Sequence, residues 1–521
     1  MTTNDAPETP GPTDYLVIGG GTAGCVVAAR LSEDPDTTVT LVEAGPSDAD
    51  EPRAHSIRRW AEMLEGEYDL DYRSVPQERG NSHIRQARMR ILGGCSTANT
   101  MISWRPLRGD LDEWVALGAQ GWDYATVSPY FDRIQAPITP IPPADRNPYL
   151  RDVIDAASAA LGLPVRESWN DVEFRTGAGY FEIGYEPETN LRSATSRTYL
   201  RTPAAAARSN LTVVLNELVE RLVIEEGRAV GALLRAPDGG RRELRARREV
   251  IVCCGAIDSP ALLMRSGIGP RAVLEAAGVE VLHELPGVGE NLQDHAEGLL
   301  VWEARGDRAK TSATGWDAGY VTTIDPDSTV PDVSTHIPLE TWGVHAERHG
   351  VTLPENNVSL VPNVAKPRSR GRVWITSPSP DVAPAVDYRY FTDPEGRDER
   401  MLVAGARLAR RVARQEPFAS HLVREVFPGP EVESDEELSA VLRATHQTVY
   451  HVSCTCRMGA DDDPTAVLDP ELRVRGVQAL RVVDASVFPT IPALNPVGLI
   501  MTVAERAVDL ITGRPRPEEP A

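Results

Sequence analysis

Short apolar runs recur along the chain at spacings that predict a parallel sheet. The first two runs, residues 15–18 and 39–43, flank a helix-compatible stretch, and similar runs return at residues 211–215, 249–253 and 479–484. Apolar strands that alternate with helices along a chain are typical of an α/β arrangement. The pattern therefore predicts an α/β domain whose strands come from distant parts of the chain.

The pattern changes between residues 300 and 445. Prolines become frequent there, residues 372–376 alternate as a strand does, and residues 401–414 have a helical pattern. This indicates a second domain inserted into the first. We expect the first domain to comprise residues 14–150, 190–296 and 446–515, the second to comprise residues 151–189 and 297–445, and the polar tails at residues 1–13 and 516–521 to be disordered.

A glycine fingerprint follows the first predicted strand. In Gly19-x-Gly21-x-x-Gly24, the first glycine allows a tight turn, the second lets the backbone approach a pyrophosphate, and the third lets a helix pack closely on the strand. The next strand ends in Glu43, the position at which an acidic side chain binds a ribose hydroxyl and repels a 2′-phosphate. The succession of strand, glycine fingerprint, helix, strand and acidic residue predicts a dinucleotide site at a helix N-terminus, with NADP the least expected ligand. The alternative is a glycine-rich turn that binds no ligand.

Composition and charge limit the partners. With 521 residues, 41% of them hydrophobic and 25% charged, the chain is an ordinary globular protein too long for one hydrophobic core. Its 54 basic and 76 acidic residues give a net charge of −22, which argues against a nucleic-acid partner and favours attraction of a cationic small molecule. Solvated acidic surface accounts for most of this charge.

The six cysteines show neither a zinc-ligand spacing nor the pattern of a secreted disulfide protein. We expect no metal site, and we interpret the pair Cys454 and Cys456 as packing residues. The N-terminus has no signal-peptide pattern, and no apolar run is long enough to span a bilayer. The prediction is a soluble, cytoplasmic protein without a membrane partner.

Two residues near the C-terminus are candidates for chemistry. Asn495-Pro496 precedes a helical stretch at residues 497–511 that Gly513 stops, so Asn495 is expected to cap this helix while its amide points into a pocket. His451 is either a buried structural histidine or a group that accepts an alcohol proton near neutral pH.

Several segments resemble the glucose–methanol–choline (GMC) oxidoreductases, a family of FAD-dependent enzymes that oxidise alcohols. They are the glycine fingerprint, Arg88-Met-Arg-Ile-Leu-Gly-Gly-Cys-Ser-Thr-Ala-Asn99, residues 255–269 and residues 484–489. The resemblance implies an FAD-binding Rossmann-like domain of GMC type with an inserted α+β substrate-binding domain. It places FAD against Gly19, Gly21, Thr22, Ala23, Gly24, Glu43, Gly93, Gly94, Ser96, Ala98, Asn99, Thr100, Val219, Gly255, Asp484, Ala485, Asn495 and Pro496.

Within the family, the choline-oxidising members are most similar, through residues 292–298, 387–396 and 448–451. This resemblance implies an aromatic cage for a trimethylammonium group, a carboxylate that faces its charge, and a second active-site histidine. These roles fall on Trp60, Trp316 and Tyr450 for the cage, on Glu297 for the carboxylate and on His336 for the histidine. Two residues, Thr100 and Trp342, differ from their counterparts in the choline-oxidising members. Trp342 is also a candidate substrate-binding residue.

The resemblance also implies a reaction. Hydride transfer from a primary alcohol to FAD gives an aldehyde, with His451 as the proton acceptor, His336 as a further stabilising group and Asn495 orienting the substrate oxygen. Oxygen is the expected electron acceptor, giving hydrogen peroxide, and the aldehyde can be oxidised further to the acid. Ala98 stands where the choline-oxidising members attach FAD through a histidine, so FAD is predicted to bind non-covalently.

Other functions remain open at this stage. The protein could oxidise neutral aryl, furanic or aliphatic primary alcohols, it could be a non-redox flavoprotein lyase, or it could bind a nucleotide without catalysis. The sequence leaves open the exact alcohol, the choice between oxygen and another electron acceptor, and the physiological pathway. A homodimer is compatible with it.

Overall fold

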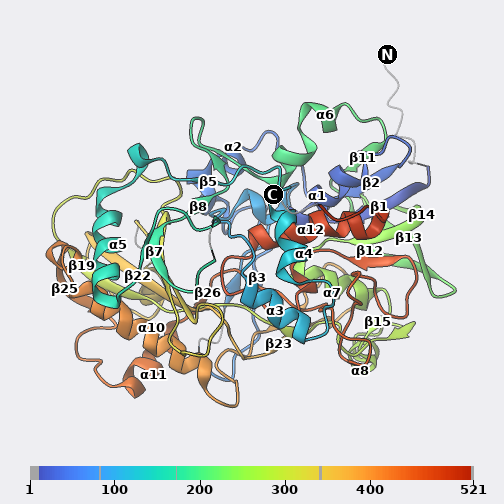
Figure 1. Ribbon diagram of the computed structural model, residues 1–521. Helices are drawn as coiled ribbons and strands as arrows, with labels where there is room; N and C mark the ends of the chain where they lie inside the picture. The colour runs from blue at the N-terminus through green and yellow to red at the C-terminus, as the bar shows by residue number, and fades with distance from the viewer. Residues whose placement is uncertain (1–10, 81–83, 172, 340–342, 518–521) are drawn as a thin grey trace.

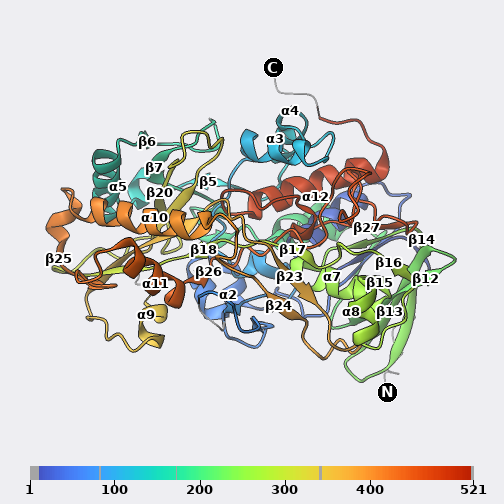
Figure 2. The ribbon, with the colours of Figure 1, turned by 90° about the horizontal axis from the view of Figure 1, so that it is seen from below.

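The computed structural model of the protein describes residues 11–80, 84–171, 173–339 and 343–517. In this part of the chain, two large sheets of seven and nine strands lie at opposite ends of an elongated molecule (Figure 1 and Figure 2). The predicted tails fall mostly outside these residues, although the first strand already begins at Thr13. The α-helices are α1 (Thr22–Leu31), α2 (Pro52–His55), α3 (Arg108–Ala116), α4 (Tyr124–Phe131), α5 (Pro148–Leu161), α6 (Pro203–Ala206), α7 (Gly255–Arg265), α8 (Arg271–Ala276), α9 (Val344–Arg348), α10 (Arg397–Ala413), α11 (Asp435–Thr445) and α12 (Val497–Thr512).

The seven-stranded sheet contains the fingerprint. Its strands are β1 (Thr13–Ile18), β2 (Val39–Val42), β11 (Leu211–Val214), β12 (Leu218–Glu225), β13 (Arg228–Arg235), β14 (Arg241–Val252) and β27 (Leu480–Val482). The order is β11-β2-β1-β14-β13-β12, with β27 also paired to β14. β1 is buried along its whole length and runs parallel to both β2 and β14. This parallel core confirms the α/β prediction and its assembly from distant segments.

The nine-stranded sheet supports the other end of the molecule. Its strands are β6 (Val165–Arg166), β7 (Gly177–Tyr180), β18 (Ala296–Glu297), β19 (Leu300–Ala304), β20 (Ala318–Thr322), β21 (Val333–Ile337), β22 (Asn357–Val364), β25 (Leu422–Phe427) and β26 (Gln447–Thr448). Apart from the β6–β7 pair, its strands pair antiparallel. α10 packs against β21 and β22, and α5 packs against β7 and β20. The fold therefore has the predicted α/β part and an α+β part, while the exact domain boundaries stay a prediction.

The shorter strands form small separate sheets. Four pairs are β3 (Tyr72–Arg73) with β4 (Arg85–Gln86), β5 (Thr139–Pro140) with β8 (Glu182–Ile183), β9 (Tyr185–Glu186) with β10 (Leu191–Arg192), and β15 (Ile268–Gly269) with β16 (His283–Glu284). A three-stranded sheet has the order β17 (Glu290–Leu292), β23 (Gly371–Trp374) and β24 (Ala385–Asp387). Cys454 and Cys456 are buried and free, which confirms that they pack rather than form a disulfide. Among the described residues, no helix is both long and apolar enough to cross a membrane.

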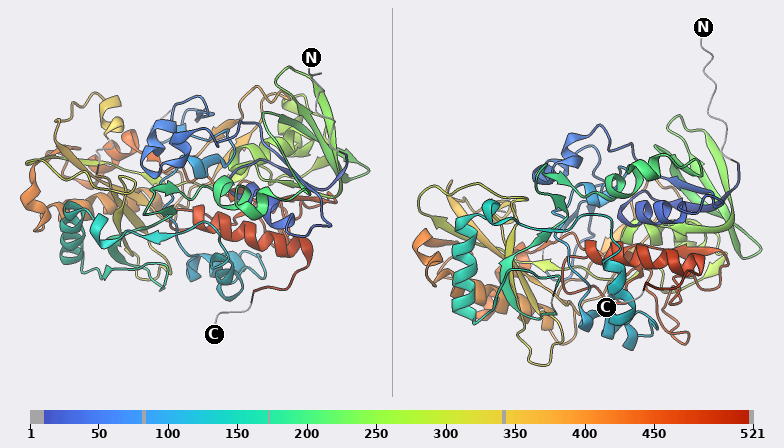
Figure 3. Two further views of the ribbon diagram at one scale, coloured as in Figure 1. Left: turned by 90° about the horizontal axis from the view of Figure 1, so that it is seen from above. Right: turned by 45° about the horizontal axis from the view of Figure 1, so that its top comes forward.

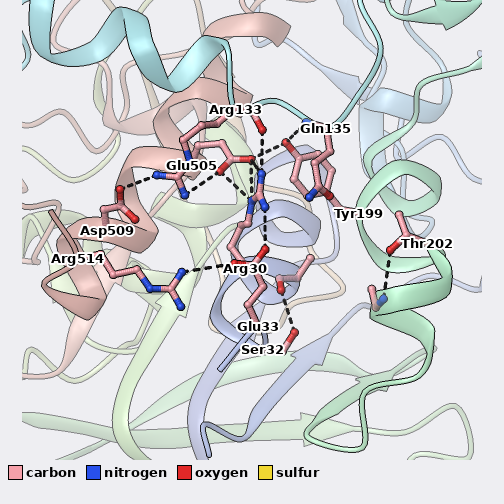
Figure 4. A network of polar contacts seen from close by, with 12 residues as sticks. Arg30, Ser32, Glu33, Arg133, Gln135, Tyr199, Thr202, Glu505, Asp509 and Arg514 are labelled. Carbon is pink, nitrogen blue, oxygen red and sulfur yellow. Dashed lines mark hydrogen bonds and ion pairs between the residues drawn. The ribbon is translucent and has the colours of Figure 1, made fainter. Parts of the chain in front are cut away.

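The C-terminal helix α12, the red helix in Figure 3, packs against α1 in the part of the molecule that holds the seven-stranded sheet. A buried polar network joins them (Figure 4). Arg30 of α1 donates from Nε to both carboxylate oxygens of Glu505 in α12 at 3.0 and 2.9 Å, and the Tyr199 hydroxyl donates to Glu505 at 2.7 Å. The Glu505 side chain is 0% exposed. Removing Arg30 would leave this charge buried, at a cost of about 3 to 5 kcal/mol, so the network fixes the two helices relative to each other.

The start of α12 differs from the prediction. The helix begins at Val497 with Pro496 as its N-cap, and no side chain caps it. The expected capping role of Asn495 is therefore wrong, because its side-chain oxygen accepts a hydrogen bond from Trp104 Nε1 at 3.0 Å instead. The predicted end is confirmed, since Gly513 follows the helix with φ at +69°.

Candidate active site

A cavity of about 1050 Å³ is lined by residues from both large sheets. One end is formed by the fingerprint and the carboxyl ends of β1 and β2, the edge at which α/β folds bind ligands. The other end is lined by His336 of β21 and Glu297 of β18, together with residues that precede α12. A single cavity thus joins the predicted dinucleotide site to the predicted substrate site.

The glycines at the first end leave room for a ligand. Gly19 has φ at +97°, and a Cβ on Gly24 would lie 1.9 Å from the Gly19 carbonyl oxygen. A Cβ on Gly21 would meet nothing nearer than 3.9 Å, so the space beside it is open. α1 begins here without a side-chain cap, and its first N–H groups are free to bind an anion. These features fit the pyrophosphate of a dinucleotide.

Glu43 directly follows β2 at the cavity wall. Its carboxylate accepts from Gly20 N at 2.8 Å and from Gly45 N at 2.7 Å. Burial raises the pKa of Glu43 to about 7, although these two bonds act in the opposite direction. Each oxygen retains a second lone pair, so Glu43 fits the predicted ribose hydroxyl, and this role stays a prediction.

Most predicted cofactor residues line the cavity. They are Gly19, Gly21, Thr22, Ala23, Glu43, Gly94, Ala98, Asn99, Thr100, Val219, Gly255, Asp484, Ala485, Asn495 and Pro496. Gly24, Gly93 and Ser96 do not line it. Ser96 is buried and donates to the Gly93 carbonyl at 2.6 Å, which stabilises the turn at Gly94–Thr97. This turn packs on the fingerprint, because a Cβ on Gly94 would lie 2.7 Å from Gly21 Cα.

Asp484 connects two distant segments at the cavity. Its Oδ2 accepts from Gly255 N at 2.9 Å and from the Ser259 hydroxyl at 2.5 Å, and its Oδ1 accepts from Ser486 N at 2.8 Å. Burial raises the pKa of Asp484, with these hydrogen bonds opposing the shift. The start of α7 is thereby fixed next to the segment that follows β27.

At the other end of the cavity, His451 forms a hydrogen bond with a second histidine. The Nδ1 atoms of His451 and His295 lie 2.8 Å apart, and His295 Nε2 lies 3.1 Å from the Pro492 carbonyl oxygen. Burial lowers the pKa of His295 to about 3, so His295 is neutral near pH 7. A carbonyl can only accept, so His295 carries its proton on Nε2 and accepts at Nδ1. His451 Nδ1 must then be the donor.

Asn495 faces the second nitrogen of His451. Because the Asn495 oxygen accepts from Trp104, its amide group is the part that lies 3.3 Å from His451 Nε2. Burial lowers the pKa of His451 well below its ordinary value, and electrostatic interactions with His295, His336 and Arg88 act in the same direction. His451 is therefore neutral, with its proton on Nδ1 and a basic lone pair on Nε2 at the cavity.

His336 and the predicted cage lie around the same space. His336 Nδ1 is 3.4 Å from Asn363 Nδ2, and burial lowers the pKa of His336 to about 4, partly offset by Asn495. Trp316 packs edge-on against both His336 and Trp60, with ring centroids 5.9 and 6.4 Å apart. The predicted residues Trp60, Glu297, Trp316, His336, Tyr450, His451 and Asn495 all line the cavity. Trp342 lies outside the described residues.

Glu297 is the acidic group at this end. It is 5% exposed, and in the described part of the chain it takes part in no ion pair. Burial, with the nearby Asp294, raises the pKa of Glu297 well above its ordinary value. The ionised form of a buried carboxyl group is stabilised most by a ligand that carries a positive charge.

Sequence reasoning missed His295 and Trp104. His295 stands two residues before Glu297, so in an extended segment the two side chains point the same way, and this spacing was an available signal. Trp104 reaches Asn495 across a sequence separation of 391 residues and left no local signal.

The chain is similar to known proteins along most of its length. Family models described as GMC oxidoreductase match residues 13–297 and 367–504. The chain is 42% identical to choline oxidase from Arthrobacter globiformis, over 96% of this chain and 94% of that protein. It is 34% identical to an oxygen-dependent choline dehydrogenase from Photobacterium profundum, over 96% and 93%.

Solved structures show the same fold. Pyridoxine 4-oxidase from Mesorbium loti superposes with a TM-score of 0.88 at 30% identity, covering 97% of this chain and 100% of that one. A fungal aryl-alcohol oxidase superposes with a TM-score of 0.82 at 22% identity, covering 97% and 99%, and supports the fold alone. The chain belongs to the GMC oxidoreductase family. It is an FAD-dependent oxidoreductase that acts on alcohols.

Proposed function

We propose that the protein oxidises choline, or a closely similar cationic primary alcohol, to the aldehyde, with oxygen as the electron acceptor and hydrogen peroxide as the second product. The observation that supports this most directly is the buried carboxyl of Glu297 in the same cavity as the basic Nε2 of His451. Similarity to choline oxidase over nearly the whole chain supports the same substrate.

The cation would bind between Glu297 and aromatic rings. A quaternary ammonium has no N–H to donate, so ring faces and one negative charge are the groups that hold it. Trp60 and Trp316 meet at an interplanar angle of 74° and form two walls at an angle to each other. Trp60 Nε1 donates to the Thr314 carbonyl at 2.9 Å, which fixes its ring in place. Tyr450 lines the cavity beside them.

His451 is the proposed proton acceptor. Its Nε2 has a lone pair toward the cavity, and the proton on its Nδ1 is shared with His295. When His451 takes the alcohol proton at Nε2, the new positive charge is stabilised by the neutral His295 acceptor 2.8 Å away. Asn495 lies next to Nε2 and is placed to donate to the alcohol oxygen. His336 is the proposed second polar contact for that oxygen.

FAD would supply the hydride acceptor, and the chain supplies binding, orientation and a proton acceptor. α12 begins at the cavity without a side-chain cap, so its free N–H groups favour negative charge there. Ala98 is 6% exposed and packs with Ala87 and Met89, and a methyl group cannot form a bond to the flavin. We therefore propose non-covalent binding, for which acid precipitation should leave all flavin in the supernatant.

A second candidate substrate is a neutral primary alcohol. The raised pKa of Glu297 favours the protonated, uncharged form of its carboxyl. Trp60 and Trp316 can pack against an aromatic ring as well as against a cation. The similarity to pyridoxine 4-oxidase, at 30% identity, also favours this alternative.

One experiment separates these functions. The FAD-loaded protein is mixed without oxygen with choline or with benzyl alcohol while flavin absorbance is followed, and air is then admitted. Faster bleaching by choline, with colour and hydrogen peroxide appearing in air, is the expected result. Faster bleaching by benzyl alcohol would assign the neutral substrate, and no bleaching by either would remove the oxidase proposal.

A further inference from the structure

His295 and His451, here called the histidine pair, are each contacted by the segment that precedes α12. The Pro492 carbonyl accepts from His295 Nε2 at 3.1 Å, and Asn495 lies 3.3 Å from His451 Nε2. Residues 488–495 form neither helix nor strand, and two of them are prolines without a backbone N–H. The position of this segment therefore depends on contacts from other parts of the molecule.

A buried ion cluster provides these contacts. Lys366 Nζ donates to the Ile491 carbonyl at 2.7 Å, and both carboxylate oxygens of Asp110 accept from Ala493 N, at 3.2 and 3.1 Å. Lys366 Nζ also donates to Asp110 at 3.0 Å. The two charged groups thus hold the backbone on either side of Pro492, the residue whose carbonyl fixes His295.

The cluster is completed by Glu113, which lies on the same side of α3 as Asp110 because the two are three residues apart. Its carboxylate is 2.7 Å from Lys366 Nζ and accepts from the Thr490 hydroxyl at 2.9 Å. The side chains of Lys366 and Asp110 are 15% and 2% exposed. Burial acts to lower the pKa of Lys366, but Asp110 and Glu113 outweigh it and raise the pKa, so the lysine stays charged.

The lysine is also an electrostatic neighbour of His295. Burial is the largest cause of the low pKa of His295, and the charge of Lys366 acts in the same direction. The other titratable groups that face His295 are His336 and His451. A positive charge behind the histidine pair favours the neutral forms on which the basic Nε2 depends.

We propose that Lys366 and Asp110 are positioning residues for proton abstraction. They hold residues 491–493 so that the Pro492 carbonyl fixes the tautomer of His295, and His295 in turn presents the unprotonated Nε2 of His451 to the alcohol. This inference rests on the proposed role of His451 as the proton acceptor.

The test compares Lys366→Met with Lys366→Arg in FAD-loaded protein, with choline as substrate and oxygen consumption as the readout. For Lys366→Met, kcat should fall on the order of tenfold with little change in KM, because geometry and not binding is lost. With benzyl alcohol, whose binding does not depend on the charge of Glu297, the acidic limb of the kcat/KM profile, the pH range in which kcat/KM falls as His451 becomes protonated, should move to higher pH because a neighbouring positive charge is lost. Lys366→Arg keeps the charge and N–H donors, and it should restore the position of the limb and most of kcat.

Matched controls separate this role from loss of stability. Arg410→Met breaks a different buried pair, with Glu425, whose residues do not line the cavity. It should lower the melting temperature without moving the acidic limb. If Lys366→Met does not load FAD, Lys366→Gln replaces it, since glutamine keeps a donor for the Ile491 carbonyl and removes only the charge.

Two outcomes would overturn the inference, and they are distinguishable. An unchanged kcat and acidic limb in the FAD-loaded Lys366 variants, while His451→Ala is strongly impaired, would show that Lys366 is structural only. Near-normal turnover of His451→Ala would remove the proposed proton acceptor itself, and with it the group that Lys366 is proposed to position.

Discussion

The Nδ1 atoms of His295 and His451 lie 2.8 Å apart, and the surrounding hydrogen bonds allow only one of them to carry a proton. The Pro492 carbonyl requires a donor at His295 Nε2, and the Asn495 amide requires an acceptor at His451 Nε2. The proton between the rings therefore belongs to His451. This arrangement leaves His451 Nε2 unprotonated at the cavity, and the hydroxyl of the proposed alcohol would replace the Asn495 amide as the partner of its one lone pair.

His451→Ala should lower kcat by a factor on the order of a hundred or more, because the alcohol loses its proton acceptor. The protein should still contain FAD and remain yellow. Steady-state turnover with choline and the flavin absorbance of the purified variant measure the two effects. Turnover close to that of the unaltered protein would exclude His451 as the base.

His295 can be tested with a matched pair of variants. His295→Asn retains an oxygen that can accept from His451 Nδ1, whereas His295→Leu has a similar volume and no acceptor. We expect the leucine variant to lose on the order of tenfold more kcat than the asparagine variant, because only leucine removes the bond that sets the tautomer. Equal kcat values for the two variants would contradict the tautomer assignment.

Glu297→Gln should weaken binding of choline and leave a neutral alcohol nearly unaffected. Loss of one partly desolvated charge beside a cation costs about 1 to 3 kcal/mol, which corresponds to an increase of about 5- to 150-fold in KM for choline. Benzyl alcohol is the control substrate. A similar increase in KM for both alcohols would remove the cation-binding role of Glu297.

The pH dependence should differ between the two alcohols. The pKa of Glu297 is raised by burial and by Asp294, so its carboxyl loses charge as the pH falls through this raised value. The pKa of His451 is lowered, so its Nε2 stays basic to a lower pH. On the acidic side, kcat/KM for choline should therefore fall at a higher pH than kcat/KM for benzyl alcohol. In Glu297→Gln the two acidic limbs should coincide; a persistent difference would assign the effect to another group.

Gly21→Ala should reduce FAD binding, whereas Gly24→Ala should reduce the stability of the protein. A Cβ at residue 21 meets no protein atom nearer than 3.9 Å but fills space at the cavity, so the variant should fold and lose FAD. A Cβ at residue 24 would lie 1.9 Å from the Gly19 carbonyl oxygen, so this variant should lose stability. FAD content after gel filtration and the melting temperature of the apoprotein measure the two effects. Full FAD retention by Gly21→Ala would contradict the assigned phosphate site.

Sequence was sufficient where the determining contacts are local. The run from Tyr15 to Glu43 contains strand, turn, helix and strand in 29 consecutive residues, and each glycine has a steric reason that follows from its local position. The orientation of the Asn495 side chain could not be predicted from local sequence. Its side chain is oriented by Trp104, which is 391 residues away, and no helix-capping rule contains that information. For His295, the spacing to Glu297 predicts that it faces the same side, but its hydrogen bond to His451, 156 residues away, has no local signal.

The hydrogen bonds of Asp484 join Gly255 to a segment 229 residues later in the chain. The wall of the cavity therefore does not exist while the N-terminal fingerprint is being synthesised, and it forms only after residues 484–497 have emerged and docked. Loading with FAD must follow translation of almost the whole protein. With no proposed covalent bond to trap the cofactor, the fraction of active enzyme in a cell would then follow the supply of free FAD, in addition to the rate of protein synthesis.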